Sequence, residues 1–171
     1  MRFTFAAATA VLAGLAAAAP KGWTDNGNCP DTVGDCLTDT QAEEIVAVYE
    51  TLISRSVTGA EFNATADSIL ADSFFTMSNS INAEIRKPLE AMTIPSPTAF
   101  KAVFSAQPPT DGTQTLDMFH SCDKIAWRWL GTSPEGLPVR GLTMMNITAD
   151  GKIADTFVEY FRPALYNCTA A

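Results

Sequence analysis

The sequence predicts an α+β fold, and the evidence is a change in the spacing of its apolar residues. In the first part of the chain they recur at helical spacing, three and four positions apart, in three segments. From Thr113 onward they alternate with polar residues, which is the period of strands with one buried face. The turn sequences "SCD", "SPEG" and "ADG" separate these alternating runs. Helices followed by a meander of antiparallel strands indicate helices packed on one face of a sheet.

The first helix is predicted to begin in the segment "TDTQAEE". Two overlapping capping boxes are present there, Thr38 with Gln41 and Thr40 with Glu43. Gly59 ends the helical pattern. The apolar positions with helical spacing are Ala42, Ile45, Tyr49, Leu52 and Ile53.

Two further helices and one strand are predicted before residue 110. A short helix carries Phe62, Ala66, Ile69 and Leu70, and "SFFTMSNS" follows it as a strand. Ser96 and Pro97 form a favourable N-cap and first-turn pair for a third helix. The residues of this helix expected to point inward are Phe100, Val103 and Phe104.

The strand "CDKIAWRWLGT" places two tryptophans on one face. Ile125, Trp127 and Trp129 share one parity, and Lys124, Ala126, Arg128 and Leu130 share the other. Each buried indole N–H needs a hydrogen-bond partner. The spacing therefore predicts that the two tryptophans form an aromatic wall, which faces either a packed core or a ligand cavity.

Residues 1–18 are predicted to be a secretory signal peptide. Arg2 precedes a charge-free, alanine-rich run that is too short for a membrane span, and Ala16 and Ala18 satisfy the small-x-small rule for cleavage. We therefore expect a soluble, extracellular protein.

The formal charge of −8 becomes −9 when Arg2 is removed. An acidic surface without a basic cluster predicts no nucleic-acid and no membrane partner.

Three sequons and four cysteines agree with export. The candidate glycosylation sites are Asn63, Asn146 and Asn167, and the cysteines are Cys29, Cys36, Cys122 and Cys168. An even number of cysteines predicts two disulfides, with three pairings open, among them Cys29–Cys36 with Cys122–Cys168. A metal site needs paired short spacings with histidine support, so we expect no metal and no cofactor.

The element order, with "CDKIAWRW" followed by "ITADGKIADTFVEYF", resembles the nuclear transport factor 2-like (SnoaL-like) superfamily. The second segment is similar to its recurrent last hairpin, and the resemblance covers roughly residues 38–163. The segments "CLTDTQAEEIVAVYETLISRS", "SFFTMSNSINAEI" and "SCDKIAWRW" resemble a family of secreted fungal proteins of this fold. The superfamily includes ketosteroid isomerase, scytalone dehydratase, limonene epoxide hydrolase and polyketide cyclases, and also members without catalysis.

This resemblance implies a cone-shaped, curved antiparallel sheet with about three N-terminal helices on its concave face, enclosing an apolar cavity. It divides the chain into a signal peptide (1–18), a disulfide-bearing arm (19–37), the domain (38–163) and a tail (164–171). It places Ala154, Thr156, Val158 and Tyr160 inward. A turn at Cys122-Asp123 pairs His120 with Ile125 and Met118 with Trp127. If Asn146 points outward, then Val139, Gly141, Thr143 and Met145 line the cavity, although a bulge would reverse this.

The predicted ligand-binding residues are Trp127, Trp129, Met118, His120, Thr156, Val158 and Tyr160. Three functions follow. The first is secreted, non-catalytic binding of a small apolar or aromatic molecule. The second is an isomerase, dehydratase or cyclase with His120 as general acid–base; however, Val158 stands where the epoxide hydrolase has an aspartate, and His120 is the only histidine. The third is an interaction protein, with a homodimer through the convex face at Ala126, Leu142, Met144 and Phe157.

Overall fold

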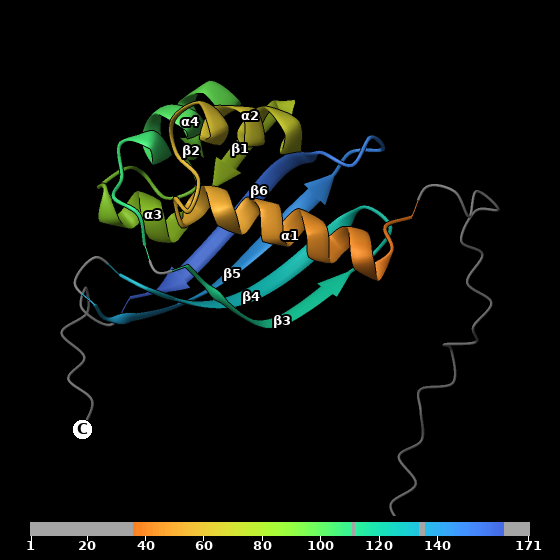
Figure 1. Cartoon of the computed structure of the whole chain (residues 1–171). Helices are drawn as coiled ribbons and strands as arrows, with labels where there is room; N and C mark the ends of the chain where they lie inside the picture. Colours follow the sequence, from red (N-terminus) through yellow and green to blue (C-terminus); the bar gives the residue numbers. More distant parts are fainter. Residues whose placement is uncertain (1–35, 111, 134–135, 163–171) are drawn as a thin grey trace, which may run out of the picture. The chain divides into compact units, whose positions relative to one another are not determined.

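A curved six-stranded sheet with helices against it forms the part of the chain that the computed structural model describes, residues 36–110, 112–133 and 136–162 (Figure 1). This confirms the predicted α+β class. The elements in chain order are α1 (Asp39–Ile53), α2 (Gly59–Ile69), β1 (Leu70–Met77), α3 (Asn79–Glu84), β2 (Met92–Ile94), α4 (Pro97–Ser105), β3 (Gln114–His120), β4 (Lys124–Thr132), β5 (Pro138–Ile147) and β6 (Ile153–Phe161).

The sheet has the strand order β2-β1-β6-β5-β4-β3. Strands β3 to β6 form the predicted antiparallel meander, with His120 opposite Ile125 and Met118 opposite Trp127 as expected. The expectation of a purely antiparallel sheet was wrong at one position, because β1 pairs in parallel with β6. The local spacing of apolar residues predicts which side chains are buried. It does not predict a parallel pair, because such a pair depends on the connection that brings two distant strands side by side.

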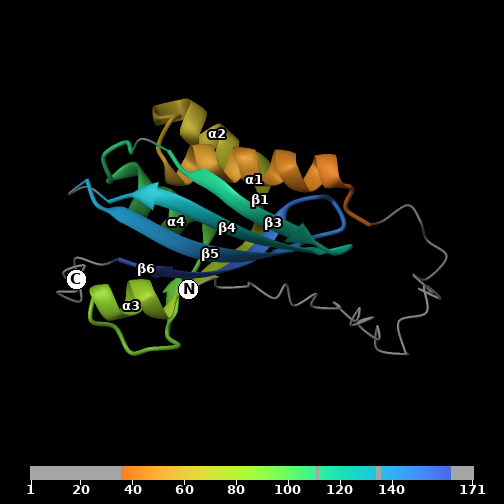
Figure 2. The ribbon, with the colours of Figure 1, turned by 90° about the horizontal axis from the view of Figure 1, so that it is seen from below.

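Helix α1 crosses the inner face of the sheet, which we define as the face that it covers (Figures 1 and 2). Its predicted capping box at Thr38 is present: the Gln41 backbone N–H donates to Thr38 Oγ1 over 3.2 Å, and the Thr38 N–H donates to Gln41 Oε1 over 2.9 Å. Its buried side chains are Ala42, Ile45, Val46, Tyr49 and Leu52. Among the described residues, no helix is long and apolar enough to cross a membrane.

Helix α4 begins as predicted, with Ser96 as N-cap and Pro97 in the first turn. Phe100 is fully buried and Phe104 packs against the core, but Val103 is 43% exposed, so its predicted inward orientation was wrong. The apolar stripe of α4 is narrow, since Phe100 and Phe104 lie one turn apart on the same side and Val103 lies at the rim.

Helix α3 was not predicted, and it lies beside β6 (Figures 1 and 2). Strand β1 ends at Met77, opposite Phe157, and α3 follows it along the remaining edge of β6. The Glu159 carboxylate accepts the backbone N–H groups of Asn79 over 2.7 Å and Ser80 over 2.9 Å. These two bonds satisfy donors that the start of a helix leaves without internal partners.

The inner face of the sheet carries the side chains that the alternation predicted. Ile125 and Trp127 are 1% and 0% exposed, and Trp129 is 8% exposed. On β5, Val139, Thr143 and Met145 are buried, so no bulge reverses that strand. The opposite, outer face exposes Leu142, Met144 and Phe157.

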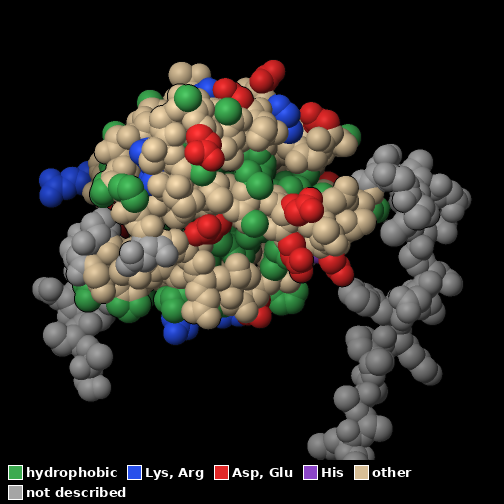
Figure 3. Space-filling model, in the orientation of Figure 1, with side chains coloured by type: hydrophobic (Ala, Val, Ile, Leu, Met, Phe, Trp, Pro, Cys, Tyr) green, Lys and Arg blue, Asp and Glu red, His purple; other side chains and the backbone are tan. Residues whose placement is uncertain are grey.

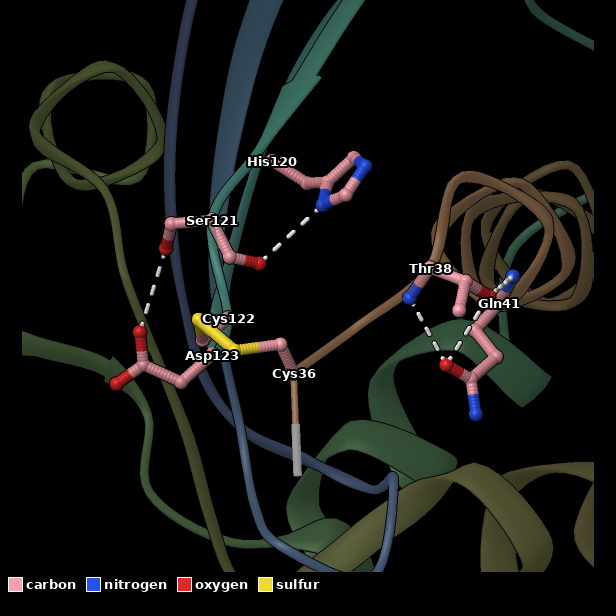
Figure 4. The surroundings of a disulfide bond; sticks show 7 residues. All are labelled: Cys36, Thr38, Gln41, His120, Ser121, Cys122 and Asp123. Atoms are coloured by element: carbon pink, nitrogen blue, oxygen red, sulfur yellow. Dashed lines mark hydrogen bonds between the residues drawn. A yellow bond between two sulfur atoms is a disulfide. The ribbon is translucent and has the colours of Figure 1, made fainter. Parts of the chain in front are cut away.

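A disulfide joins Cys36, just before α1, to Cys122 in the β3–β4 turn (Figure 4). The Leu37 backbone N–H also donates to the Cys122 carbonyl over 3.1 Å. This pairing excludes Cys29–Cys36 with Cys122–Cys168. The other two cysteines lie outside the described residues, as do Asn167, the predicted signal peptide, most of the predicted arm and the predicted tail.

Candidate functional site

The inner face of the sheet is closely filled around the two tryptophans. Their ring centroids lie 6.1 Å apart. Trp127 Nε1–H donates to Thr115 Oγ1 and Trp129 Nε1–H to Thr143 Oγ1, both over 3.0 Å. The indole N–H groups therefore have the partners that burial demands.

A second polar group of the interior connects α1 to β6. Thr76 Oγ1 and Thr156 Oγ1 are hydrogen-bonded over 2.8 Å, and both residues are buried. Burial raises the pKa of Tyr49 to about 12, and a hydrogen bond with Thr156 lowers it in part. Tyr49 is thus a neutral phenol at neutral pH. The polar side chains of Tyr49, Thr76 and Thr156 thus bond to one another.

The aromatic wall reaches the surface at the end of the sheet where Trp129, Gly141 and Tyr160 lie in one cross-strand row. We call this row, with Glu84 beside it, the open end. The Trp129 and Tyr160 ring centroids lie 6.4 Å apart, and Tyr160 is partly exposed. A Cβ atom at Gly141 would lie well inside 3.0 Å of the Trp129 ring, so the ring rests directly on the glycine backbone.

Glu84, the last residue of α3, adds a carboxylate to the open end. The hydroxyl of Tyr160 hydrogen-bonds Glu84, and Glu84 Oε2 lies 3.7 Å from Arg162 Nη1. Burial raises the pKa of Tyr160, and the hydrogen bond and negative charge of Glu84 raise it further. Glu84 Oε1 is buried and has no hydrogen-bond partner among the described residues.

His120 lies at the other end of the wall, between β3 and the start of α1 (Figure 4). We call this end, with the Cys36–Cys122 disulfide, the stapled end. His120 Nε2 lies 2.7 Å from Asp39 Oδ1, and Nδ1 lies 3.2 Å from the Ser121 carbonyl oxygen. The hydrogen bonds to Asp39 and Ser121 raise the pKa of His120. Both ring nitrogens are engaged at the rim of the sheet.

The structure divides the predicted ligand-binding residues into three groups. Trp127 and Thr156 are fully buried, Val158 lies in the same cross-strand row as Trp127, and Trp129 and Tyr160 lie at the open end. Met118 packs against the core beside Trp127. His120 pairs with Ile125, four residues along β4 from Trp129, which corresponds to roughly 13 Å. One small molecule at the open end would not contact His120.

Two residues of the open end were not recognised as a site in the sequence. Glu84 sits in "NAEIRK", which resembles an ordinary exposed helix end. Gly141 was predicted to point inward, and the antiparallel register opposite Trp129 is the signal that could have revealed its packing role.

Of the described sequons, Asn63 is exposed on α2, and the amide of Asn146 bonds to Lys124 and Asp155.

The outer face carries an apolar row across four strands. Phe119, Ala126, Met144 and Phe157 are consecutive cross-strand partners, and we call them the outer row. Phe119 is 66% exposed, Met144 47% and Phe157 42%. A shallow hollow of about 400 Å³ adjoins this row, lined by Arg128, Arg140, Gly141, Leu142, Glu159, Tyr160 and Phe161.

Acidic side chains are spread over the face that carries α1, where apolar groups show between α1 and the sheet (Figure 3).

These features define a helix-covered cone of strands with an aromatic inner wall, and residues 35–161 match the family model for the NTF2-like domain. The chain belongs to this family of domains. No match is found among curated proteins.

Solved structures share this fold at low sequence identity. An NTF2-like protein of unknown function from Mesorhizobium loti is 20% identical, with a TM-score of 0.54 over 72% of this chain and 93% of that one. A candidate isomerase of the SnoaL-like family from Agrobacterium tumefaciens is 11% identical, with a TM-score of 0.54 over 72% of this chain and 99% of that one. At such identities the likeness establishes the fold and not an activity.

Proposed function

We propose that the domain is an exported, non-catalytic binding protein for a small apolar or aromatic molecule, held at the open end against Trp129 and Tyr160. The observation that carries the proposal is the gradient of burial along the aromatic wall. Trp127 is fully buried, Trp129 retains 8% exposure, and Tyr160 is partly exposed. Ligand sites combine apolar and aromatic walls with a few converging polar groups, and Glu84 and Tyr160 supply those groups.

The deep interior supports binding at the open end rather than behind the wall. A ligand seated between Trp127 and Thr156 would have to break the hydrogen bonds that these residues make to Thr115 and Thr76. Opening a satisfied polar network leaves buried donors and acceptors without partners. A ligand on the outer edge of Trp129 needs no such change.

The position of His120 favours binding over catalysis. A general base needs a nitrogen lone pair directed at a substrate proton. Asp39 and Ser121 occupy both ring nitrogens of His120, and the pKa of the imidazole is raised. Both ring nitrogens therefore face groups of the protein itself, at the stapled end and away from the open end.

Export is part of the same proposal. The predicted signal peptide, the sequons and the cysteine count suggest it, and the Cys36–Cys122 disulfide is of the kind that persists in oxidising compartments.

Native mass spectrometry of the exported protein, followed by thermal melting with a library of apolar compounds, tests this function. A compound that binds only the folded state at 100 times its Kd adds about 2.7 kcal/mol of stability. A shift of roughly 5–10 °C in Tm is then expected for a domain of this size. Trp129→Leu should reduce the shift by at least half, whereas the matched outer-face variant Phe157→Leu should leave it unchanged. If no compound raises Tm, the open end is simply part of the core.

A second function has its own observation, the outer row. Exposed contiguous apolar side chains often mark protein contacts. We propose that two copies of the chain associate through this row, with Leu142 beside Met144 at its centre. Sedimentation of deglycosylated protein at tens of micromolar should give a dimer mass, and Met144→Asp should give a monomer. A monomer mass for the unmodified chain would contradict the homodimer.

A further inference from the structure

Glu84 Oε1 is a buried acceptor without a donor. The Glu84 side chain is 20% exposed, while its Oε1 atom is buried with no hydrogen-bond partner among the described residues. Buried polar atoms in native proteins are bonded in about nine cases of ten, and one that is not calls for an explanation. Arg162, at 3.7 Å from Oε2, lies on the other oxygen of the carboxylate.

The position of this acceptor ties it to the aromatic wall. Helix α3 runs along the edge of β6, and Glu159 and Ser80 hold it there: Glu159 accepts the Ser80 N–H, and Ser80 Oγ accepts the Tyr160 N–H over 3.1 Å. This docking brings Glu84 to the Tyr160 hydroxyl, and the Tyr160 ring lies against Trp129. Only the Tyr160 side chain thus connects the Glu84 acceptor to the Trp129 ring, on which a ligand would stack.

The charge of the site selects among ligands. Glu84 would repel a carboxylate or phosphate. A neutral hydroxyl group brings the missing donor without a second charge, and its bond to an ionised acceptor is stronger than a neutral one.

We propose that Glu84 selects hydroxylated aromatic molecules, with the ligand ring against Trp129 and the ligand hydroxyl donating to Glu84 Oε1. The Tyr160 hydroxyl hydrogen-bonds the same carboxylate. This inference rests on the proposed binding function and adds the class of ligand to it.

Equilibrium dialysis with 2-naphthol and 2-methoxynaphthalene tests the inference, since the two share an aromatic ring system and only the first has a donor. The unmodified chain should bind 2-naphthol about tenfold more tightly, as one hydrogen bond to a charged acceptor implies. In Glu84→Met the preference should disappear because 2-naphthol weakens, while 2-methoxynaphthalene keeps its affinity. Lys87→Met, a nearby exposed substitution, is the matched control and should keep the preference.

The outcomes separate this inference from the function on which it rests. Binding of both compounds with equal affinity overturns the role of Glu84 and leaves the binding function in place. A preference that persists in Glu84→Met also overturns it. Failure of either compound to bind contradicts the binding function and, with it, the inference. If Glu84→Met does not fold, Glu84→Gln, which keeps a weaker acceptor, should reduce the preference to a few-fold.

Discussion

The stapled end and the open end of the aromatic wall are held by different means. At the stapled end, a disulfide, the His120–Asp39 pair and a backbone hydrogen bond connect α1 to the β3–β4 turn. At the open end, Trp129 rests on Gly141 and a buried carboxylate oxygen lacks a donor. The stapled end is built to resist opening, while the open end keeps an unsatisfied group at the edge of an apolar surface. Ligand sites have this second character.

Removing the disulfide should produce the largest effect. The bond closes a loop with a sequence separation of 86 residues, and loops of this length correspond to about 4.5 kcal/mol of stabilisation. Guanidinium unfolding of the double variant Cys36→Ala, Cys122→Ala should show a loss of this size. Ligand affinity at the open end should stay within twofold. A loss below about 1 kcal/mol would mean that the other contacts already hold the stapled end.

A methyl group at Gly141 should disturb the open end directly. In Gly141→Ala the new Cβ overlaps the Trp129 ring, and overpacking of this kind costs about 2 kcal/mol. Gly131 is the matched control, because a Cβ there meets Thr113 at 3.4 Å and the same Trp129 ring at 3.6 Å, which are ordinary contacts. Unfolding curves that show equal losses for Gly131→Ala and Gly141→Ala would contradict this reading of the ring position.

The partners of the two indole N–H groups offer a finer comparison. Thr143 is 1% exposed, so Thr143→Val leaves the Trp129 N–H buried without an acceptor, at about 1.5 kcal/mol. Trp127 is fully buried, but its acceptor Thr115 is an exposed residue of the edge strand β3. In Thr115→Val a small shift of this edge strand is enough to admit water to the Trp127 N–H, so the loss should be about 0.5 kcal/mol. Chemical denaturation of both variants measures the difference, and a reversed order would overturn it.

The smallest effect concerns pH at the stapled end. The folded-state pKa of His120 is raised above 6.5 by Asp39 and Ser121, so protonation stabilises the folded chain. This contribution is complete below pH 6.5 and is lost as the pH rises through the folded-state pKa. Because Asp39 is 93% exposed, it should amount to about 0.5 kcal/mol. His120→Asn should flatten the pH dependence of unfolding above pH 6.5, and an unchanged profile would contradict the assignment.

The inner and outer parity of β4 was predictable because alternation is a local property of the sequence, whereas that of β6 followed from the family resemblance and that of β5 from an outward Asn146. The spacing of two residues between Ile125, Trp127 and Trp129 is enough to predict that their side chains share the inner face of the sheet. The capping residues Thr38 and Ser96 were predictable for the same reason, since each bonds within its own first turn.

The parallel β1–β6 pair, β2 and α3 were not predictable from local pattern. Phe74 and Thr76 show that β1 is half buried, but nothing near them in sequence reveals that their strand runs beside β6. Helix α3 owes its position to Glu159, 80 residues away from Asn79. The Glu84 acceptor at the open end depends on that docking, so no pattern near Glu84 in the sequence predicts it.

The place of β6 in the sheet has a consequence for how the protein is made. It is the last strand of the described chain, yet it lies between β1 and β5. Until β6 has been synthesised, the β2–β1 ribbon and the β3–β4–β5 meander have no strand to join them. Pairings between such distant segments form slowly and leave unpaired edges exposed in the meantime. The nascent chain therefore completes its sheet only after β6 has been synthesised, and a truncation before Ile153 would divide the sheet in two.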